Sequence, residues 1–207
     1  MSNSSRRVSV TANQGSLFGD GSRRITSGPD GQTTYFPARV EHSIALAWFA
    51  ELRDSIAWQS ERRRMYDRDV DVPRLVMRFA FGEAALPAPI VAAARVASRV
   101  TGQPYNSAGL NYYRDGRDSV APHNDKLHML VAGCPIAILS LGATRRMVIS
   151  TKATPRKTVS VDLENGSILL MDYQTQLHFN HGIPKVAAPV GGRISITFRM
   201  RPDSPAA

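Results

Sequence analysis

The stretch TVSVDLENGSILLM, residues 158–171, has the pattern of two strands joined by a turn. Residues 158–163 alternate between polar and apolar side chains, as expected of a strand with one buried face. Asn165-Gly166 is a turn signal, and the apolar run of residues 167–171 follows it. The stretch therefore predicts neighbouring short strands with no helix between them.

The rest of the chain places this stretch in a mainly β protein. Residues 135–141 form a compact apolar run, and residues 193–200 alternate with period two. Upstream, residues 42–58 and 89–100 carry apolar side chains at helical spacing, and Gly102 follows the second run. Two helices followed by many short strands predict an α+β, mainly β fold: an antiparallel sandwich or jelly roll backed by N-terminal helices.

The composition is that of a folded domain with a basic surface. The chain has 207 residues, 43% of them hydrophobic and 21% charged, which is enough for one domain with a core. Lys and Arg number 26 against 17 Asp and Glu, and only four of the 26 are lysines. Because the planar guanidinium of Arg suits phosphates and carboxylates, we expect a polyanionic partner, nucleic acid above all.

The same composition excludes several classes of protein. A single cysteine, Cys134, excludes an internal disulfide framework and a cysteine-based zinc or iron–sulfur site. The longest apolar stretches, such as residues 90–100, are too short or too interrupted to cross a bilayer. The N-terminus lacks the apolar core of a signal peptide. We expect a cytoplasmic monomer without membrane association.

The chain divides into an arm and one domain. Residues 1–32 are rich in Ser, Gly, Asn and Asp and carry two Arg pairs, which predicts a flexible basic arm. An ordered strand within the arm is the alternative. Residues 33–203 are expected to form a single domain, with the strand-rich core at about 104–201.

His123 and Asp125 form a candidate metal site. They are two residues apart, so in an extended segment both side chains project from the same face. A third ligand must come from a later segment, which offers His178 and His181. Two imidazoles and one carboxylate leave open coordination positions, as in non-haem Fe(II) oxygenases. Zinc is the competing metal, although no His-Glu-x-x-His motif occurs, and an ordinary loop hydrogen bond is the structural alternative.

Two further pairs could bind an anionic ligand. Arg193 and Arg199 are six residues apart, which places both guanidiniums on one strand face. Two such cations repel unless a dianion, such as a dicarboxylate, lies between them. Asn111 and Tyr113 are again two apart and could add hydrogen bonds. The alternatives are an exposed edge strand for the arginines, and a buried Tyr with a turn-capping Asn for the second pair.

Four separated stretches together resemble the AlkB family of Fe(II)/2-oxoglutarate-dependent nucleic-acid dealkylases. They are NYYRDGRDSVAPHND, PIAILSLGATRRM, SILLMDYQTQLHFNHGIPK and GGRISITFRMR, whose order and spacing match over roughly residues 104–201. The upstream VPR at residues 72–74 is similar to the family's base-recognition region, here about 33–103. The resemblance implies a double-stranded β-helix. It also implies oxidative demethylation of N-alkylated bases, such as 1-methyladenine and 3-methylcytosine, in DNA and/or RNA, with formaldehyde, succinate and CO2 as products.

The resemblance assigns the metal ligands. It implies that His123, Asp125 and His181 hold Fe(II), and that His178 is a neighbouring pocket or sheet residue. His181 is preferred because it precedes the family's isoleucine-proline context.

The resemblance also assigns the binding of 2-oxoglutarate, the co-substrate used together with O2. Arg193 and Tyr113 would hold its distal carboxylate. Asn111 and Arg199 would hold the end that chelates iron. Ser195 stands where some members have an Asn that also touches the co-substrate.

The base is expected to leave the stack and to lie between aromatic side chains, where a cationic methylated base gains cation–π attraction. Basic side chains would contact the phosphates. The candidate substrate-binding residues are Tyr66, Phe79, Phe81, Arg145 and Lys126, with Trp58 assigned to the core.

Other functions stay open at this stage. Family members often carry acidic residues just after His-x-Asp, where this chain has Lys126, Leu127 and His128. This departure leaves open a 2-oxoglutarate oxygenase that acts on a protein or small molecule. A non-catalytic nucleic-acid-binding module is the alternative from another class.

Overall fold

The structure, a computed structural model, describes residues 21–65, 68–82 and 85–202, without the side chains of residues 62–71. It contains two antiparallel sheets. The major sheet runs in the order β1-β2-β10-β7-β12-β5-β4-β3, and the minor sheet runs β6-β11-β8-β9. In sheet order the major strands are β1 (Arg23–Thr26), β2 (Thr33–Phe36), β10 (Ile168–Met171), β7 (Ile136–Gly142), β12 (Arg193–Arg199), β5 (Ser107–Tyr113), β4 (Arg68–Ala80) and β3 (Gln59–Met65). The minor strands are β6 (Val120–His123), β11 (Phe179–Ile183), β8 (Arg145–Thr151) and β9 (Thr158–Leu163).

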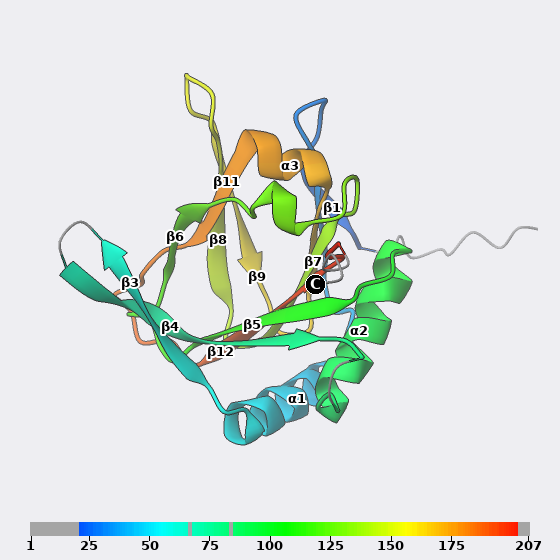
Figure 1. Cartoon of the computed structure of the whole chain (residues 1–207), viewed down its shortest axis with the longest axis vertical. Helices are drawn as coiled ribbons and strands as arrows, with labels where there is room; N and C mark the ends of the chain where they lie inside the picture. The colour runs from blue at the N-terminus through cyan, green and yellow to red at the C-terminus, as the bar shows by residue number, and fades with distance from the viewer. Residues whose placement is uncertain (1–20, 66–67, 83–84, 203–207) are drawn as a thin grey trace, which may run out of the picture.

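The two sheets face each other across one hydrophobic core, and two helices cover the outer face of the major sheet (Figure 1). The inner core joins residues of both sheets, among them Ile138 of β7 and Ile149 of β8. The outer core packs α1 (His42–Ser55) and α2 (Ala88–Thr101) against the sheet. This arrangement is a jelly roll of the double-stranded β-helix type, so the predicted fold class is confirmed.

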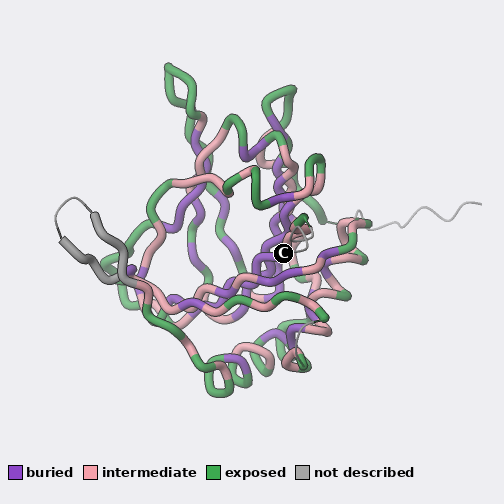
Figure 2. Tube along the Cα trace, in the orientation of Figure 1, coloured by how far each residue is buried: buried purple, intermediate pink, exposed green. Residues whose placement is uncertain are grey.

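Strand β12 is buried on both faces, which explains its unusual pattern. Ile194, Ile196 and Phe198 are fully buried in the outer core, beneath the helices. The alternate residues are polar and line a cavity between the sheets. Figure 2 shows that burial continues through the centres of the strands in this region. The alternation therefore marks a strand whose inner, polar face lines a binding site and whose outer face packs on helices.

The helices form close to the predicted positions. In α2 the chain ends its last turn at Gly102, which adopts φ 69° and donates its N–H to the carbonyl of Ser98, as expected of a C-terminal glycine. In α1 the buried face is centred on Ala45 and Leu52, whereas Ile44 is exposed. None of the helices within the described residues has the length and apolar character to traverse a bilayer.

Several strands and one helix were not part of the leading prediction. Residues 23–26 form β1, which pairs with β2, so the alternative of an ordered strand within the expected arm holds for these residues. Residues 1–20 lie outside the described residues. The short helix α3 (Tyr173–His178) interrupts the strand-rich half, and the side chain of Asp172 caps it by accepting a hydrogen bond from the backbone N–H of Thr175. Strands β3 and β4 extend the major sheet upstream of residue 104.

Candidate functional site

Two histidines face each other across the first two strands of the minor sheet. Strands β6 and β11 pair so that His123 lies opposite His181. The two ring centroids are 4.5 Å apart. Asp125 follows β6 by two residues and lines the same small cavity as both rings. The three side chains predicted as metal ligands thus line one cavity, whereas His178 lies on α3 and does not line it.

Both imidazoles are suited to bind a metal ion. Burial lowers the pKa of His181 to about 3, with a further contribution from His123, and burial also lowers the pKa of His123. The rings are therefore neutral at pH 7 and keep the lone pair that a metal requires. Nδ1 of His123 lies 2.9 Å from the carbonyl oxygen of Ala121, an arrangement that leaves its Nε2 free as a ligand.

The carboxylate of Asp125 is held by Arg199. It accepts hydrogen bonds from Nε at 2.5 Å and from Nη2 at 3.1 Å. Burial acts to raise the pKa of Asp125, but the charge and hydrogen bonds of Arg199 outweigh it, so the pKa lies below its ordinary value. Across the described ranges 21–65, 68–82 and 85–202, no three His, Cys, Asp or Glu side chains are already grouped as a metal site. Iron would therefore have to share this carboxylate with Arg199.

The backbone of Asp125 is positioned from the opposite side. Its N–H donates to Oε1 of Gln176 at 3.0 Å, and Gln176 is fully buried on α3. Lys152 donates to the carbonyl of the same glutamine. The unpredicted helix thus supports the residue that follows β6, a role that sequence spacing alone gave no reason to expect.

Arg193 is a buried cation with unused donors. It is 1% exposed, and burial lowers its pKa to about 10. Its Nη2 donates to Oγ of Ser140 at 2.8 Å, whereas Nε and Nη1 have no hydrogen-bond partner among the described residues. The guanidinium also lies 5.3 Å from the ring centroid of Tyr113. Because an unsatisfied buried cation is costly, this group fits an anionic ligand in the adjacent cavity.

That cavity, of about 50 Å³, is lined by every residue predicted to bind 2-oxoglutarate. Nδ2 of Asn111 donates to Oγ of Ser195 at 3.4 Å, and Oδ1 of Asn111 accepts from Nε of Arg74 at 2.7 Å. The cavity combines the guanidiniums of Arg74, Arg193 and Arg199 with apolar side chains, a lining that suits a short dicarboxylate. Residues of this cavity wall that the sequence did not single out include Ile136, Ile138, Met147, Met171, Ile183 and Thr197.

A larger cavity of about 720 Å³ adjoins this site. His123, Asn111, Asp125, Arg199 and Arg74 line both cavities, so they form the boundary between them. The described lining of the larger cavity otherwise comes mainly from β4 and from the segment around β6. A substrate in the larger cavity would therefore lie directly beside His123.

The aromatic residues predicted to sandwich a base lie elsewhere. Phe79 and Phe81 pack on the outer core under the helices, and neither lines a cavity beside the histidines. The reason is register: Val76 pairs with Asn111 of the inner face, so Phe79 projects from the opposite face of β4. Trp58 packs on Tyr112 in the same outer core, as predicted.

The three remaining substrate candidates are Lys126, Arg145 and Tyr66. Lys126 is exposed and lines the larger cavity. Arg145, in contrast, is 2% exposed, and its guanidinium donates to backbone carbonyls, so it is not placed to contact a phosphate. Tyr66 lies outside the described residues.

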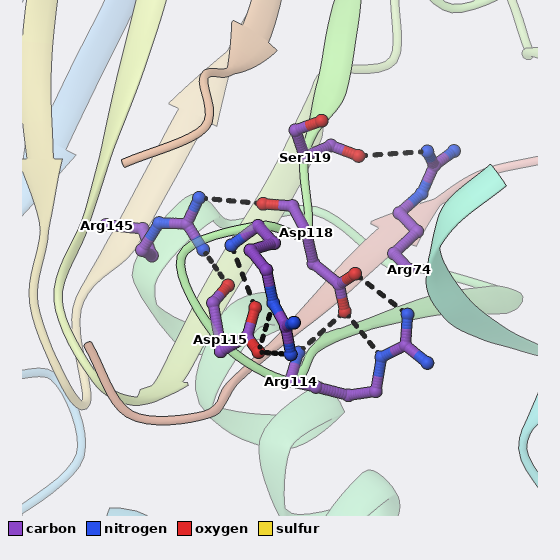
Figure 3. Close-up of polar contacts among 7 residues, drawn as sticks. Arg74, Arg114, Asp115, Asp118, Ser119 and Arg145 are labelled. Carbon is purple, nitrogen blue, oxygen red and sulfur yellow. Dashed lines mark hydrogen bonds and ion pairs between the residues drawn. The ribbon is translucent and has the colours of Figure 1, made fainter. Parts of the chain in front are cut away.

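Arg145 instead ties together the loops around the site. Nη1 donates to the carbonyl of Asp115 at 2.9 Å, and Nη2 donates to the carbonyls of Asp118 at 2.9 Å and Pro184 at 2.8 Å. Figure 3 shows this guanidinium against the loop between β5 and β6, where Asp118 also pairs with Arg114. Because the loop leads to His123 and Pro184 follows β11, one side chain links the supports of both histidines.

Arg145→Lys is expected to lower the free energy of unfolding by about 1–3 kcal/mol, because buried carbonyls lose donors that an ammonium cannot replace in the same plane. Urea unfolding followed by circular dichroism measures the change. Arg146→Lys is the matched control, since Arg146 is exposed and pairs with Asp162 at the surface. It should change stability by less than about 0.5 kcal/mol. Equal effects of the two substitutions would contradict the role given to Arg145.

Comparisons with known proteins agree with this geometry. The family model described as the 2OG-Fe(II) oxygenase superfamily matches residues 81–199. The chain is 39% identical over 112 residues to the human protein named DNA oxidative demethylase ALKBH2, covering 49% of this chain and 42% of the relative. It is 37% identical over 113 residues to the rat alpha-ketoglutarate-dependent dioxygenase alkB homolog 3, covering 50% and 38%. The match thus spans about two fifths of the length of these relatives.

One solved structure extends the comparison to the fold. The structure titled "The structure of OsALKBH1" superimposes with a TM-score of 0.60 over 81% of this chain and 97% of that chain. Sequence identity is 16%, so this likeness concerns the fold alone.

Proposed function

We propose that this chain, which belongs to the 2OG-Fe(II) oxygenase superfamily, oxidatively demethylates N-alkylated bases in DNA or RNA. The AlkB-like character predicted from four sequence stretches is confirmed by the family match and by the curated relatives. Fe(II), 2-oxoglutarate and O2 are the cofactor and co-substrates of the family. The observation that carries the proposal is the cross-strand pair of His123 and His181 beside the buried, incompletely paired Arg193.

Within this proposal each side chain has a defined task. His123, Asp125 and His181 hold the iron. Arg193 and Tyr113 bind the distal carboxylate of 2-oxoglutarate, and Ser140 fixes the guanidinium through its hydrogen bond.

The opposite end of the co-substrate lies beside the metal. Asn111 and Arg199 bind the keto-acid end, and Arg199 also orients the carboxylate of Asp125. Ser195 keeps the amide of Asn111 in place. The apolar wall of the cavity limits the access of water to the reacting groups.

When bound, iron with 2-oxoglutarate and O2 supplies the oxidation of a methyl C–H bond, with succinate and CO2 as co-products. The product carries a hydroxymethyl group on the base nitrogen. When its hydroxyl loses a proton, the C–N bond breaks, its electron pair stays on the nitrogen, and the carbon departs as formaldehyde. The protein binds the base beside the metal and holds both reactants in position. A base in a duplex must leave the stack to reach the cavity.

The decisive experiment incubates the iron-loaded protein, with 2-oxoglutarate and in air, with single-stranded DNA or RNA that carries 1-methyladenine or 3-methylcytosine. We expect formaldehyde and the unmethylated base in equal amounts, measured by fluorescent derivatisation and mass spectrometry. The unmethylated oligonucleotide is the substrate control, and His181→Ala is the protein control. Succinate formed without formaldehyde from any of these oligonucleotides would instead favour a protein or small-molecule substrate. A protein that binds the strand and forms no succinate would be a non-catalytic module.

A further inference from the structure

The larger cavity is lined by an excess of positive charge. Its described lining includes Arg78, Arg199, Arg201 and Lys126, together with Arg74 on the boundary to the smaller cavity. Asp125 is the one carboxylate among the described lining residues, and it is already paired with Arg199. Positive charges therefore outnumber negative charges among the described lining residues.

Local structure holds these cations close to one another. The backbone of Arg201 is fixed by Asn106, which accepts its N–H through Oδ1 and donates to its carbonyl through Nδ2, both at 2.8 Å. On the neighbouring strands, Arg78 of β4 lies opposite Gly109 of β5. A Cβ atom at Gly109 would lie 3.0 Å from Nη1 of Arg199, so glycine makes room for that guanidinium against the sheet.

This clustering has an energetic cost in the absence of an anion. The pKa of Arg201 is lowered mainly by burial and further by the positive charges of Arg199 and Arg78. Arg201 makes no ion pair within the described ranges. Arg78 pairs with Glu61 but is 64% exposed and keeps other N–H groups available. Like charges that converge on a cavity are stabilised when a ligand brings the opposite charge.

We propose that Arg78 and Arg201 form a phosphate subsite for a phosphodiester of the substrate strand, adjacent to the nucleotide whose base enters the cavity. The inference rests on the proposed function and adds the group by which the strand is held. Two planar guanidiniums match the oxygens of a phosphodiester, and the cavity is large enough to admit a nucleotide. Lys126, exposed on the same lining, adds a third positive charge.

The first test measures binding without turnover. Fluorescence anisotropy with an unmodified single-stranded oligonucleotide gives affinity over a range of salt concentrations. Arg78→Gln and Arg201→Gln should each weaken binding about tenfold at low salt and reduce the slope of log affinity against log salt by about 0.7. Arg201→Lys should recover part of the slope, because it keeps the charge. Arg146→Gln is the matched control, since Arg146 is exposed but lines neither cavity.

The second test separates the subsite from the base cavity. The ratio of kcat/KM for a methylated oligonucleotide to kcat/KM for the corresponding methylated nucleoside should fall about tenfold in Arg78→Gln and Arg201→Gln. The nucleoside lacks the phosphate, so a loss that is equal for both substrates would overturn the proposal. Salt slopes equal to that of Arg146→Gln would overturn it as well.

Failure of the subsite and failure of the proposed function give different results. If the wild-type protein released no formaldehyde from any methylated oligonucleotide, the proposed function would be wrong, while the salt slopes would still test the subsite. If formaldehyde were released but the slopes did not change, only the subsite would be wrong. Thermal unfolding of each variant verifies that it is folded before either comparison.

Discussion

His181→Ala is expected to lose Fe(II) binding and demethylation together, while the protein stays folded. The substitution removes one of the two neutral imidazoles that face each other across β6 and β11. The remaining His123 and Asp125 would hold the ion with two ligands instead of three. We expect the affinity for Fe(II) to fall by more than about 100-fold, because a direct ligand contributes more than the outer partners whose loss costs 10–100-fold.

His178→Ala is the matched control for this prediction. His178 lies three residues earlier, on α3, with its side chain 48% exposed and 3.9 Å from the carboxylate of Asp30. Anaerobic addition of Fe(II) and 2-oxoglutarate should give a weak visible charge-transfer band in the wild type and in His178→Ala, and none in His181→Ala. Equilibrium dialysis of Fe(II) provides a second measurement. A band that survives in His181→Ala and disappears in His178→Ala would assign the third ligand to the other histidine.

The choice between these histidines shows what the sequence could and could not predict. Spacing alone placed His123 and Asp125 on one face and left the third ligand open. The register of β6 with β11 resolves the geometry, since it pairs His181 with His123. The register of two strands depends on the packing of whole sheets, so a local sequence pattern does not predict it.

Strands were predicted well where one face is polar and the other apolar. Residues 158–163 coincide with β9, and the polar alternation of β12 correctly indicated a strand with polar side chains on one face. The helix α3 was missed because it is only six residues long and follows an apolar run directly. Its one signal was Asp172, a residue type that favours the position before a helix.

Side-chain direction was the weakest part of the prediction. Phe79 and Arg145 were both assigned to substrate by residue type, and the structure places one under the helices and the other in buried contact with carbonyls. For Arg145 a signal existed: it shares a strand face with Met147 and Ile149, both buried, whereas Arg146 on the other face is exposed. The aromatic face of β4 gave no such signal, because apolar residues occur on both of its sides.

Arg193→Met is expected to change stability and ligand affinity in opposite directions. In the ligand-free protein the guanidinium is buried with two nitrogens unpartnered, so an apolar side chain of similar length should stabilise the fold by about 1–3 kcal/mol. The hydrogen bond to Ser140 and the cation–π contact with Tyr113 are lost, and neither offsets the burial of the charge. Arg193 thus lowers the stability of the ligand-free protein, and its role is to bind the carboxylate of 2-oxoglutarate.

The same substitution should abolish the binding of 2-oxoglutarate. Two charge-assisted hydrogen bonds to a carboxylate, at about 1.5–3 kcal/mol each, correspond to a loss of affinity of more than about 100-fold. Anaerobic thermal unfolding with Fe(II) measures both effects. At a concentration about 100 times the Kd, 2-oxoglutarate should stabilise the wild type by about 2.7 kcal/mol. Arg193→Met should be more stable than the wild type without 2-oxoglutarate, and adding 2-oxoglutarate should not change its stability.

Arg146→Met supplies the comparison for this last prediction, because it removes an exposed guanidinium and should leave the shift caused by 2-oxoglutarate unchanged. If Arg193→Met were less stable than the wild type and still responded to 2-oxoglutarate, Arg193 would be a structural cation of the core. The two readings differ in sign, so one unfolding experiment separates them. If Arg193→Met is more stable than the wild type and no longer responds to 2-oxoglutarate, the guanidinium destabilises the empty protein and binds the anion. Its place in the core is then explained by ligand binding and not by folding.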